Sequence, residues 1–447
     1  MDADYKKYIY GDKAVVPFGL SRISSRAFYK CSGLTSIEIP NSVTEIGDHA
    51  FYGCSSLTSI EIPNSITKIG DGAFSECSGL TSIEIPNSVT EIGNEVFYGC
   101  SGLTSIEIPN SVTEIGDYAF NRCSGLTSVE IPNSVTRIGD GAFSLCPRLT
   151  KIEIPNSVTQ IRDKAFSLCS SLANIEIPNS VTKIGDWAFA GCFGLTSIKI
   201  PNSVTEIGDH AFERCRGLTN IEIPDSVTKI GEETFHGCSG LTSIEIPNSV
   251  TEIGDRAFIF CEGLEIILVH PSNPEYSSAD NCLLSSDLKT IFWGNKKSII
   301  PNSVVEIGNS AFSGCSGLTS IEIPNSVTKI GDEAFSGCTG LTYIEIPNSV
   351  TKIGTRAFNG CSSLTSIEIP NSVTEIGDGA FVECSGLKEI RLHQEKPDEA
   401  QSIVKSGLKM YQNLSQITLY TPIGTGYAYR HNEFFSQFKE IIPKLKQ

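Results

Sequence analysis

The sequence contains little histidine, methionine or tryptophan, and its acidic residues outnumber its basic ones. Its 447 residues include six His, two Met and two Trp, which leaves little material for imidazole-rich or thioether-rich sites. Lys and Arg together number 34, against 51 Asp and Glu, so the formal net charge is −17. Because nucleic acids and anionic membranes attract a basic face, this balance argues against a general binder of either.

Long apolar runs are absent as well. The longest are a few residues, such as Ile266–Val269, well below the ~20 residues of a membrane-spanning helix. The first ten residues are polar, so we see no secretory leader in them, although one can have been removed. A hydrophobic share of 40% is nevertheless enough for a continuous core. We therefore expect a folded chain that does not insert into a membrane.

Signatures of catalysis and of bound cofactors are also missing. The sequence has no H-E-x-x-H, G-x-S-x-G or Walker motif, and residues 424–426 lack the third glycine of a dinucleotide loop. It has neither the C-x-x-C pair typical of zinc sites nor the D-x-D-x-D-G loop typical of calcium sites. We predict that the protein is not an enzyme and that it has no catalytic residues, no cofactor and no metal site.

What the sequence does have is a repeat of 23 residues, marked by cysteine. The unit reads C-S-G-L-T-S-I-E-I-P-N-S-V-T-E-I-G-D-x-A-F-x-x, and a short fixed period of this kind is typical of stacked repeat proteins. The interval from residue 261 to residue 315 is 54, which is two periods plus 8. The in-register cysteines are Cys31, Cys54, Cys77, Cys100, Cys123, Cys146, Cys169, Cys192, Cys215, Cys238, Cys261, Cys315, Cys338, Cys361 and Cys384.

The first half of each unit predicts a strand. In the first regular unit, Ile37 and Ile39 alternate with Ser36 and Glu38, which indicates one buried and one exposed face. Pro40 follows and ends the ladder, because it lacks a backbone donor.

The second half of each unit predicts a short helical turn. Asp48 is suited to cap that turn, and Ala50, Phe51 and Cys54 then share one inward face. Because one unit has too few apolar side chains to offset the entropy lost on ordering, neighbouring units must stack and share a core. The fold class we predict is an α/β repeat: a solenoid of 23-residue turns with a parallel sheet on one face and short helical turns on the other.

The period also divides the chain. We expect a degenerate N-terminal repeat at 1–30, regular repeats at 31–261 and 315–390, irregular repeats with an insertion at 262–314, and a C-terminal cap at 391–447. Within the cap, the pattern predicts one helix over residues 398–410 and a second over residues 434–441.

The unit L-T-S-I-E-I-P-x-S-V-T-x-I-G-D-x-A-F-x-x-C resembles the BspA-type leucine-rich repeat. Residues 273–287 are similar to a variant turn of that family, with Cys282 where the family usually has Gly, and residues 417–441 are similar to its closing segment. The resemblance covers nearly the whole chain. It implies a right-handed leucine-rich-repeat solenoid and a surface-exposed or secreted binding protein, often an adhesin. It brings no catalytic residues.

The cysteines are predicted to be small core residues instead of disulfide partners. Equivalent Cα atoms in stacked turns lie ~4.8 Å apart, but parallel Cβ vectors leave the Cβ atoms equally far apart, beyond the ~3.5–4.5 Å that a disulfide prefers. Cys282 breaks the register, so it is the best candidate for an exposed thiol.

A column of glutamates occupies one outward strand position and is our main candidate site. Lys199, Leu268 and Arg391 interrupt it. The column is either a solvated face or a binding stripe for a basic ligand or cation. Outside the column we add Tyr276 and Trp293 from the irregular region and Tyr343 from a variable strand position. The column consists of Glu38, Glu61, Glu84, Glu107, Glu130, Glu153, Glu176, Glu222, Glu245, Glu322, Glu345 and Glu368.

Three functions compete at this point. The first is a protein-binding module or adhesin on the cell surface or outside the cell, whose rigid acidic face engages host or cell-surface proteins, possibly basic ones. The second is a cytoplasmic scaffold or spacer with no ligand on the sheet face, which the missing leader and unpaired cysteines favour. The third, an enzyme acting on acidic polysaccharide, fits poorly because the glutamate column repels such a substrate.

Overall fold

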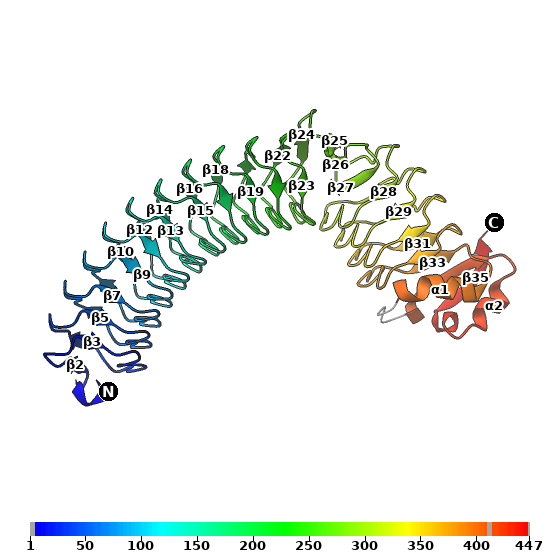
Figure 1. Ribbon diagram of the computed structural model, residues 1–447. Coiled ribbons are helices and arrows are strands. Elements are labelled where there is room, and N and C mark those ends of the chain that lie inside the picture. The colour runs from blue at the N-terminus through cyan, green and yellow to red at the C-terminus, as the bar shows by residue number, and fades with distance from the viewer. Residues whose placement is uncertain (1–4, 409–413, 446–447) are drawn as a thin grey trace. The chain divides into compact units, whose positions relative to one another are not determined.

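The computed structural model describes residues 5–408 and 414–445. The chain divides into two compact units. Unit 1 comprises Met1–Leu241 with Glu252–Ala257, and unit 2 comprises Thr242–Thr251 with Phe258–Gln447. Both units are built from stacked coils of the 23-residue repeat, so each is a solenoid with parallel strands, as predicted (Figure 1).

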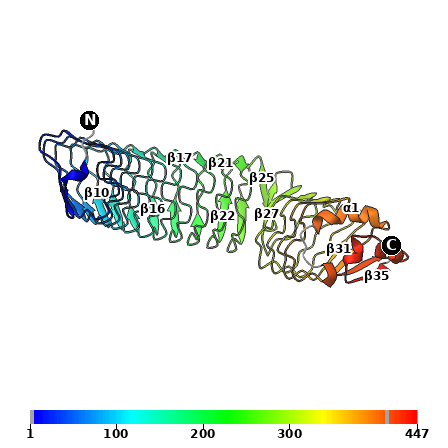
Figure 2. The same ribbon diagram turned by 90° about the horizontal axis from the view of Figure 1, so that it is seen from below.

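Each coil of unit 1 contributes two short strands instead of one, and the strands of successive coils form two ladders. The first ladder comes from the S-I-E segments, and Figure 2 shows its strands side by side. It consists of β2 (Lys13–Val15), β4 (Ser36–Glu38), β6 (Ser59–Ile60), β8 (Ser82–Ile83), β10 (Ser105–Glu107), β12 (Ser128–Glu130), β14 (Lys151–Ile152), β16 (Asn174–Glu176), β18 (Ser197–Lys199) and β20 (Asn220–Ile221).

The second ladder comes from the dipeptide before the G-D pair, a strand that the sequence pattern did not lead us to predict. It consists of β3 (Arg22–Ile23), β5 (Glu45–Ile46), β7 (Lys68–Ile69), β9 (Glu91–Ile92), β11 (Glu114–Ile115), β13 (Arg137–Ile138), β15 (Gln160–Ile161), β17 (Lys183–Ile184), β19 (Glu206–Ile207), β21 (Lys229–Ile230) and β23 (Glu252–Ile253). In both ladders, residues one period apart are directly opposite each other, as Ile106 and Val129 are. At the N-terminal end, η1 (Tyr5–Tyr8) and β1 (Ile9–Tyr10) precede β2, and β1 pairs with it antiparallel.

The side opposite the first ladder is made of tandem turns, so our prediction of helical turns there was wrong. The variable residue of G-D-x-A-F has a positive φ, 53° at His49 and 60° at Gly72, which an α-helix does not allow. Alternate amides donate to the next coil instead of along their own: the His49 N–H donates to the Asp71 carbonyl at 2.8 Å, and the Phe51 N–H to that of Ala73 at 2.8 Å. Backbone hydrogen bonds therefore join each coil to the next on the turn side as well as in the ladders.

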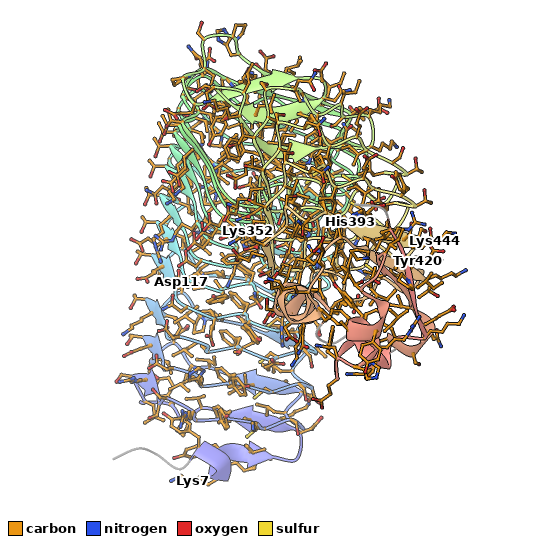
Figure 3. The ribbon with its side chains drawn as sticks, turned by 90° about the vertical axis from the view of Figure 1, so that its right-hand side faces the viewer. Lys7, Asp117, Lys352, His393, Tyr420 and Lys444 are labelled. Atoms are coloured by element: carbon orange, nitrogen blue, oxygen red, sulfur yellow. The ribbon has the colours of Figure 1, made fainter. Side chains whose placement is uncertain are left out.

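The aspartate of each coil bonds to the next coil, and it does not cap a helix. Asp117 Oδ1 accepts the Asp140 N–H at 2.9 Å and an Arg137 guanidinium N–H at 2.7 Å (Figure 3). Asp48 Oδ1 accepts the Asp71 N–H in the same way. The left-handed residue that follows each aspartate turns the chain, so the amides that a cap would need point toward the neighbouring coil.

The core of unit 1 is a stack of phenylalanines bordered by thiols. Neighbouring rings from Phe28 to Phe235 have centroids 5.2–5.9 Å apart and are nearly parallel. Each thiol from Cys54 to Cys238 donates to the carbonyl of the phenylalanine one coil earlier, for example Cys54 Sγ to Phe28 O at 3.2 Å. All sixteen cysteines, which lie among the described residues, are thiols and not disulfides. This agrees with the prediction from ladder geometry.

Unit 2 begins with β22 (Ser243–Ile246) and β24 (Ile266–Val269), which pair in parallel. An antiparallel hairpin, β25 (Tyr276–Ala279) and β26 (Cys282–Ser285), then leads into β27 (Thr290–Gly294). The regular second ladder resumes from β27 through β28 (Glu306–Ile307), β29 (Lys329–Ile330), β30 (Lys352–Ile353) and β32 (Glu375–Ile376). Cys282 lies inside this hairpin and is fully buried, so our prediction that it is an exposed thiol was wrong. Burial also raises its pKa to about 11.

Unit 2 ends in a four-stranded parallel sheet with two short helices. It contains the parallel strands β31 (Ser366–Ile369), β33 (Glu389–Leu392), β34 (Thr418–Pro422) and β35 (Glu440–Leu445), the helices α1 (Pro397–Gly407) and α2 (Gly426–Arg430), and the 3-10 turns η2 (Leu414–Gln416) and η3 (Phe435–Gln437). The first predicted helix is confirmed as α1, although residues 409–410 of that prediction lie outside the described residues. The second was wrong: after η3 the chain extends as β35, which pairs with β34.

Candidate binding surface

All twelve glutamates of the column point outward and are exposed, as the alternation predicted. In β10 and β12, Glu107 lies directly opposite Glu130. Among the described residues of unit 1, the column's only ion pair joins Lys151 Nζ to Glu153 Oε1 at 2.8 Å. That pair lowers the pKa of Glu153 through a hydrogen bond and charge attraction. Glu176 and Glu222 lie opposite Lys199. The other glutamates have like charges as neighbours, which at ~4.8 Å repel by roughly 0.9 kcal/mol per neighbouring pair in water.

Part of this column lines a groove of about 950 Å³ in unit 1. Glu61, Glu84 and Glu107 line it from three successive coils, and Pro63 and Pro86 belong to the corner that follows the strands. The strands β6 and β8 pair in register, and on the turn side the Phe74 N–H donates to the Val96 carbonyl of the next coil at 3.0 Å, so the spacing of these carboxylates is set before any ligand arrives. We call this groove and its three glutamates the acidic groove.

The second ladder carries charge in a different way. Lys68 Nζ lies 3.6 Å from Glu45, Lys183 Nζ lies 3.1 Å from Glu206, and Lys229 Nζ lies 2.9 Å from Glu252. Unit 2 repeats the arrangement with Lys329–Glu306 at 2.6 Å and Lys352–Glu375 at 2.7 Å. Sequence reasoning missed this ladder, although a charged or polar residue precedes an isoleucine at almost every period.

Near the C-terminal end of unit 2, the outward face of the first-ladder strands carries a cluster of acidic, basic and aromatic side chains. Glu368 lies opposite Arg391 in the ladder, and its Oε1 is 2.7 Å from His393 Nε2. The Arg391 guanidinium lies over the Tyr420 ring, 5.4 Å from its centroid. Figure 3 shows His393, Tyr420 and Lys444 in this part of unit 2. The uniform acidic face therefore gives way to paired and aromatic groups at the cap.

The three aromatic candidates outside the column have different positions. Tyr343 is 55% exposed, and partial desolvation and the nearby Glu345 raise its pKa. Tyr276 is half-buried and meets Phe292 edge to face at 5.7 Å. Trp293 is only 5% exposed, so our prediction that it forms part of a binding surface was wrong. Its indole N–H donates to the Phe258 carbonyl at 3.1 Å, the kind of bond that a thiol makes in the regular coils.

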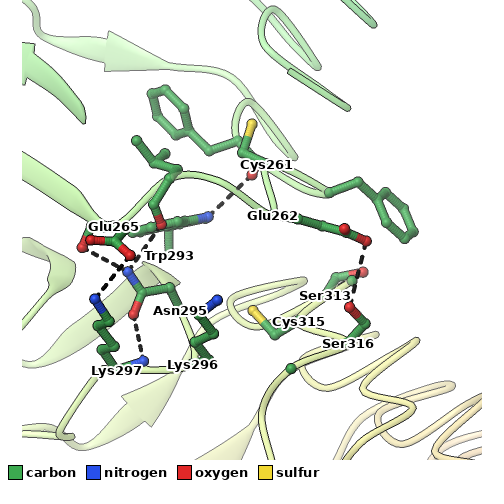
Figure 4. A pocket seen from close by; sticks show the side chains of 15 residues that line it. Cys261, Glu262, Glu265, Trp293, Asn295, Lys296, Lys297, Ser313, Cys315 and Ser316 are labelled. Atoms are coloured by element: carbon green, nitrogen blue, oxygen red, sulfur yellow. Dashed lines mark hydrogen bonds and ion pairs between the residues drawn. The ribbon is translucent and has the colours of Figure 1, made fainter. Parts of the chain in front are cut away.

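Trp293 also borders a small pocket of about 160 Å³ in unit 2 (Figure 4). Most polar side chains that line it already form hydrogen bonds or ion pairs within unit 2. The Asn295 amide nitrogen donates to the carbonyls of Leu264 and Glu265, and Lys297 Nζ pairs with Glu265 at 2.9 Å. The pocket therefore arises from the packing of the irregular coils, and it shows no convergent set of reactive groups.

On the turn side of unit 1, the variable position builds a cluster that sequence reasoning treated only as exposed. The Trp187 ring stacks on His210 with centroids 4.5 Å apart, and Lys164 Nζ lies 5.1 Å from the Trp187 ring centroid. Glu233 Oε2 is 2.7 Å from His236 Nδ1 and 3.6 Å from His210 Nδ1. Among the described residues, no group of three or more His, Cys, Asp or Glu has an arrangement that could hold a metal ion.

The stacked coils, the two strand ladders and the exposed acidic face define a leucine-rich-repeat solenoid. A sequence model described as the BspA type leucine rich repeat region, in six copies, matches residues 8–105, 90–219, 205–300 and 293–403. The chain belongs to the BspA-type leucine-rich repeat family. Among the described residues no helix is long and apolar enough to cross a membrane.

Two solved structures are similar to this chain. A leucine-rich repeat protein from Bacteroides ovatus is 33% identical, with 86% of this chain and 90% of that chain covered and a TM-score of 0.56. A leucine rich cell surface protein from Faecalibacterium prausnitzii is 26% identical over 96% of this chain and 90% of that chain, with a TM-score of 0.44. A comparison with curated proteins found no match.

Proposed function

We propose that this chain is a non-enzymatic protein-binding module, exposed at the cell surface or secreted, that holds basic segments of partner proteins in the acidic groove. One observation carries the proposal: the first ladder lines up glutamates over seven successive coils with a single ion pair among the described residues, whereas the second ladder of the same coils places Lys and Arg among its glutamates. A partner that supplies Lys or Arg relieves the repulsion along the first ladder, so complementary charge is favoured there.

Two further properties support this function. The carboxylates stand on a backbone held by hydrogen bonds between coils, so little conformational entropy is lost when a ligand binds. The same side chain recurs at every coil, so several weak contacts act together on one extended ligand. Family membership supports the location, because BspA-type repeats are typical of surface-exposed and secreted proteins.

The second candidate is an intracellular scaffold whose sheet face holds no ligand. The cysteines favour it, because sixteen thiols without a disulfide are more usual in a reducing compartment. Burial weakens that argument, since it raises the pKa of thiols such as Cys54 and Cys100 to about 12 and so protects them from oxidation in any compartment.

Fluorescence anisotropy with a labelled peptide that alternates lysine and serine tests the proposal. We expect binding that weakens as salt rises, and an affinity loss of about tenfold, or about 1.4 kcal/mol, in the variant E61Q/E84Q/E107Q. The matched control is E91Q/E95Q/E114Q, which changes the net charge equally in nearby coils but away from the groove. Equal losses in the two variants would show that only the overall charge matters and would favour the scaffold.

A further inference from the structure

The glutamate column of unit 2 is broken by apolar side chains that stand in its register. In the pairing of β22 with β24, Leu268 lies opposite Glu245 and Ile266 lies opposite Ser243. Leu268 is 54% exposed and Ile266 is 44% exposed, while Ile267 between them is buried. The alternation of the strand is therefore intact, and its outward face has changed from acidic to apolar.

The next coil repeats the change. Ile299 precedes Glu322 by one period of 23 residues, so it occupies the glutamate position, and it is 69% exposed. The side chains on either side of it, Ser298 and Ile300, are buried, so Ile299 points outward. Sequence reasoning missed this residue because the insertion before it hides the register.

Structural bonds hold these two coils together. Lys297 Nζ pairs with Glu265 Oε1 at 2.9 Å, and the Asn295 amide nitrogen donates to the Glu265 carbonyl at 2.8 Å. Near the ends of the strands, the hairpin turn lies between the coils: the Val269 N–H donates to Ser278 Oγ at 3.0 Å, and the Ile299 N–H to the Asp280 carbonyl at 3.1 Å. Ile266 and Leu268 lie on the outward face of β24, and Ile299 lies on the outward face of the next coil, with the hairpin turn between them. We call these three exposed side chains the apolar patch.

Acidic residues lie on both sides of the apolar patch. Glu245 precedes it, and Glu322 and Glu345 follow it at successive periods, exposed and without an ion pair among the described residues. Exposed apolar side chains rimmed by charge are typical of sites where proteins dock. The glutamates beside the patch also favour one kind of partner segment, because they would repel an apolar segment that is flanked by acidic residues.

We propose that the apolar patch anchors a large apolar side chain of an extended partner segment whose following residues are basic. The inference rests on the proposed function, and it names the partner's sequence chemistry. Alternate side chains of an extended chain recur about every 7 Å, and the coils recur about every 4.8 Å. An anchor on Ile299, at the end of the patch nearest the glutamates, therefore places basic side chains two and four positions later within reach of Glu322 and Glu345.

Two labelled peptides test this arrangement by fluorescence anisotropy. Both alternate lysine and serine after their first residues, and they differ only at one preceding position, which is tryptophan in the first peptide and serine in the second. For the native chain we expect the tryptophan peptide to bind about tenfold more tightly. In L268Q/I299Q, which changes no charge, we expect that advantage to disappear while the serine peptide binds as before.

The matched control is F292Q/I423Q, which removes two exposed apolar side chains of unit 2 outside the patch and should keep the tenfold advantage. Circular dichroism checks that both variants fold. Equal binding of the two peptides to the native chain would overturn the apolar anchor and leave the acidic groove intact. Failure of both peptides to bind would overturn the proposed function and the anchor together.

Discussion

The two strand ladders of unit 1 come from the same 23-residue repeat, yet they treat charge differently. The second ladder joins opposite charges across most of its coils, as in Lys183–Glu206 and Lys229–Glu252, although Glu91 and Glu114 lie opposite each other. The first ladder places Glu107 opposite Glu130 and leaves both without a cation. The coils therefore stack equally well with paired charges, so stacking does not explain why the first ladder has a column of glutamates. Neighbouring glutamates of the first ladder repel each other, and a bound cationic partner would relieve that repulsion. The first ladder is therefore the better candidate for a binding surface.

The largest effect on stability should come from placing a charge on the buried face of a first-ladder strand instead of on its exposed face. Ile106 is buried and Glu107 is exposed in the same strand, β10. We expect I106K to lose more than about 4 kcal/mol of unfolding free energy, because it buries an unpaired charge. E107K should stay within about 0.5 kcal/mol. Urea denaturation followed by circular dichroism measures both, and similar losses would show that the strand register is wrong.

A second prediction concerns the dry core that the two ladders enclose. Burial raises the pKa of Cys54, Cys100 and Cys169 from about 9 to about 12. At pH 8 the thiolate fraction of such a group falls about a thousandfold. A chromogenic disulfide reagent should therefore react slowly with the native chain, first at the half-buried Cys31, and should count sixteen thiols in denaturant.

The same shift gives a pH dependence. The unfolded thiols ionise near pH 9, whereas the native ones stay protonated until about pH 12. Between these values the unfolded chain binds fewer protons, so the unfolding free energy should fall as the pH rises. If most thiols of the native chain instead reacted quickly with the disulfide reagent at pH 8, the core between the two ladders would not be closed to solvent.

The smallest effects should have opposite signs in the two ladders. E84Q/E107Q/E130Q removes like-charge contacts, so we expect it to raise the unfolding free energy by about 1 kcal/mol at low salt, with the gain vanishing at high salt. E206Q breaks the contact with Lys183, so we expect a loss of about 0.2–1 kcal/mol. Paired denaturation curves at two salt concentrations measure both. Changes of the same sign would remove the distinction between the ladders.

The sequence by itself determined the period, the stacking and which side of each first-ladder strand faces out, because a 23-residue unit with alternating isoleucines can bury them only against its neighbours. It also indicated reduced thiols, since the geometry of a parallel ladder opposes disulfides. These features follow from local patterns repeated many times, and each copy supports the others.

Only the tertiary structure decided the turn side, the irregular coils and the pairing of charges. The sequence indicates that Asp48 caps a helix. In the structure, the left-handed φ of His49 directs the following amides to the next coil. Cys282 and Trp293 read as exposed until the hairpin encloses one and Phe258 accepts the indole N–H of the other. For Asp48 and Trp293 the partner lies in a neighbouring coil, and for Cys282 it is the inserted hairpin, so the pattern of the repeat alone does not show the side chain's environment.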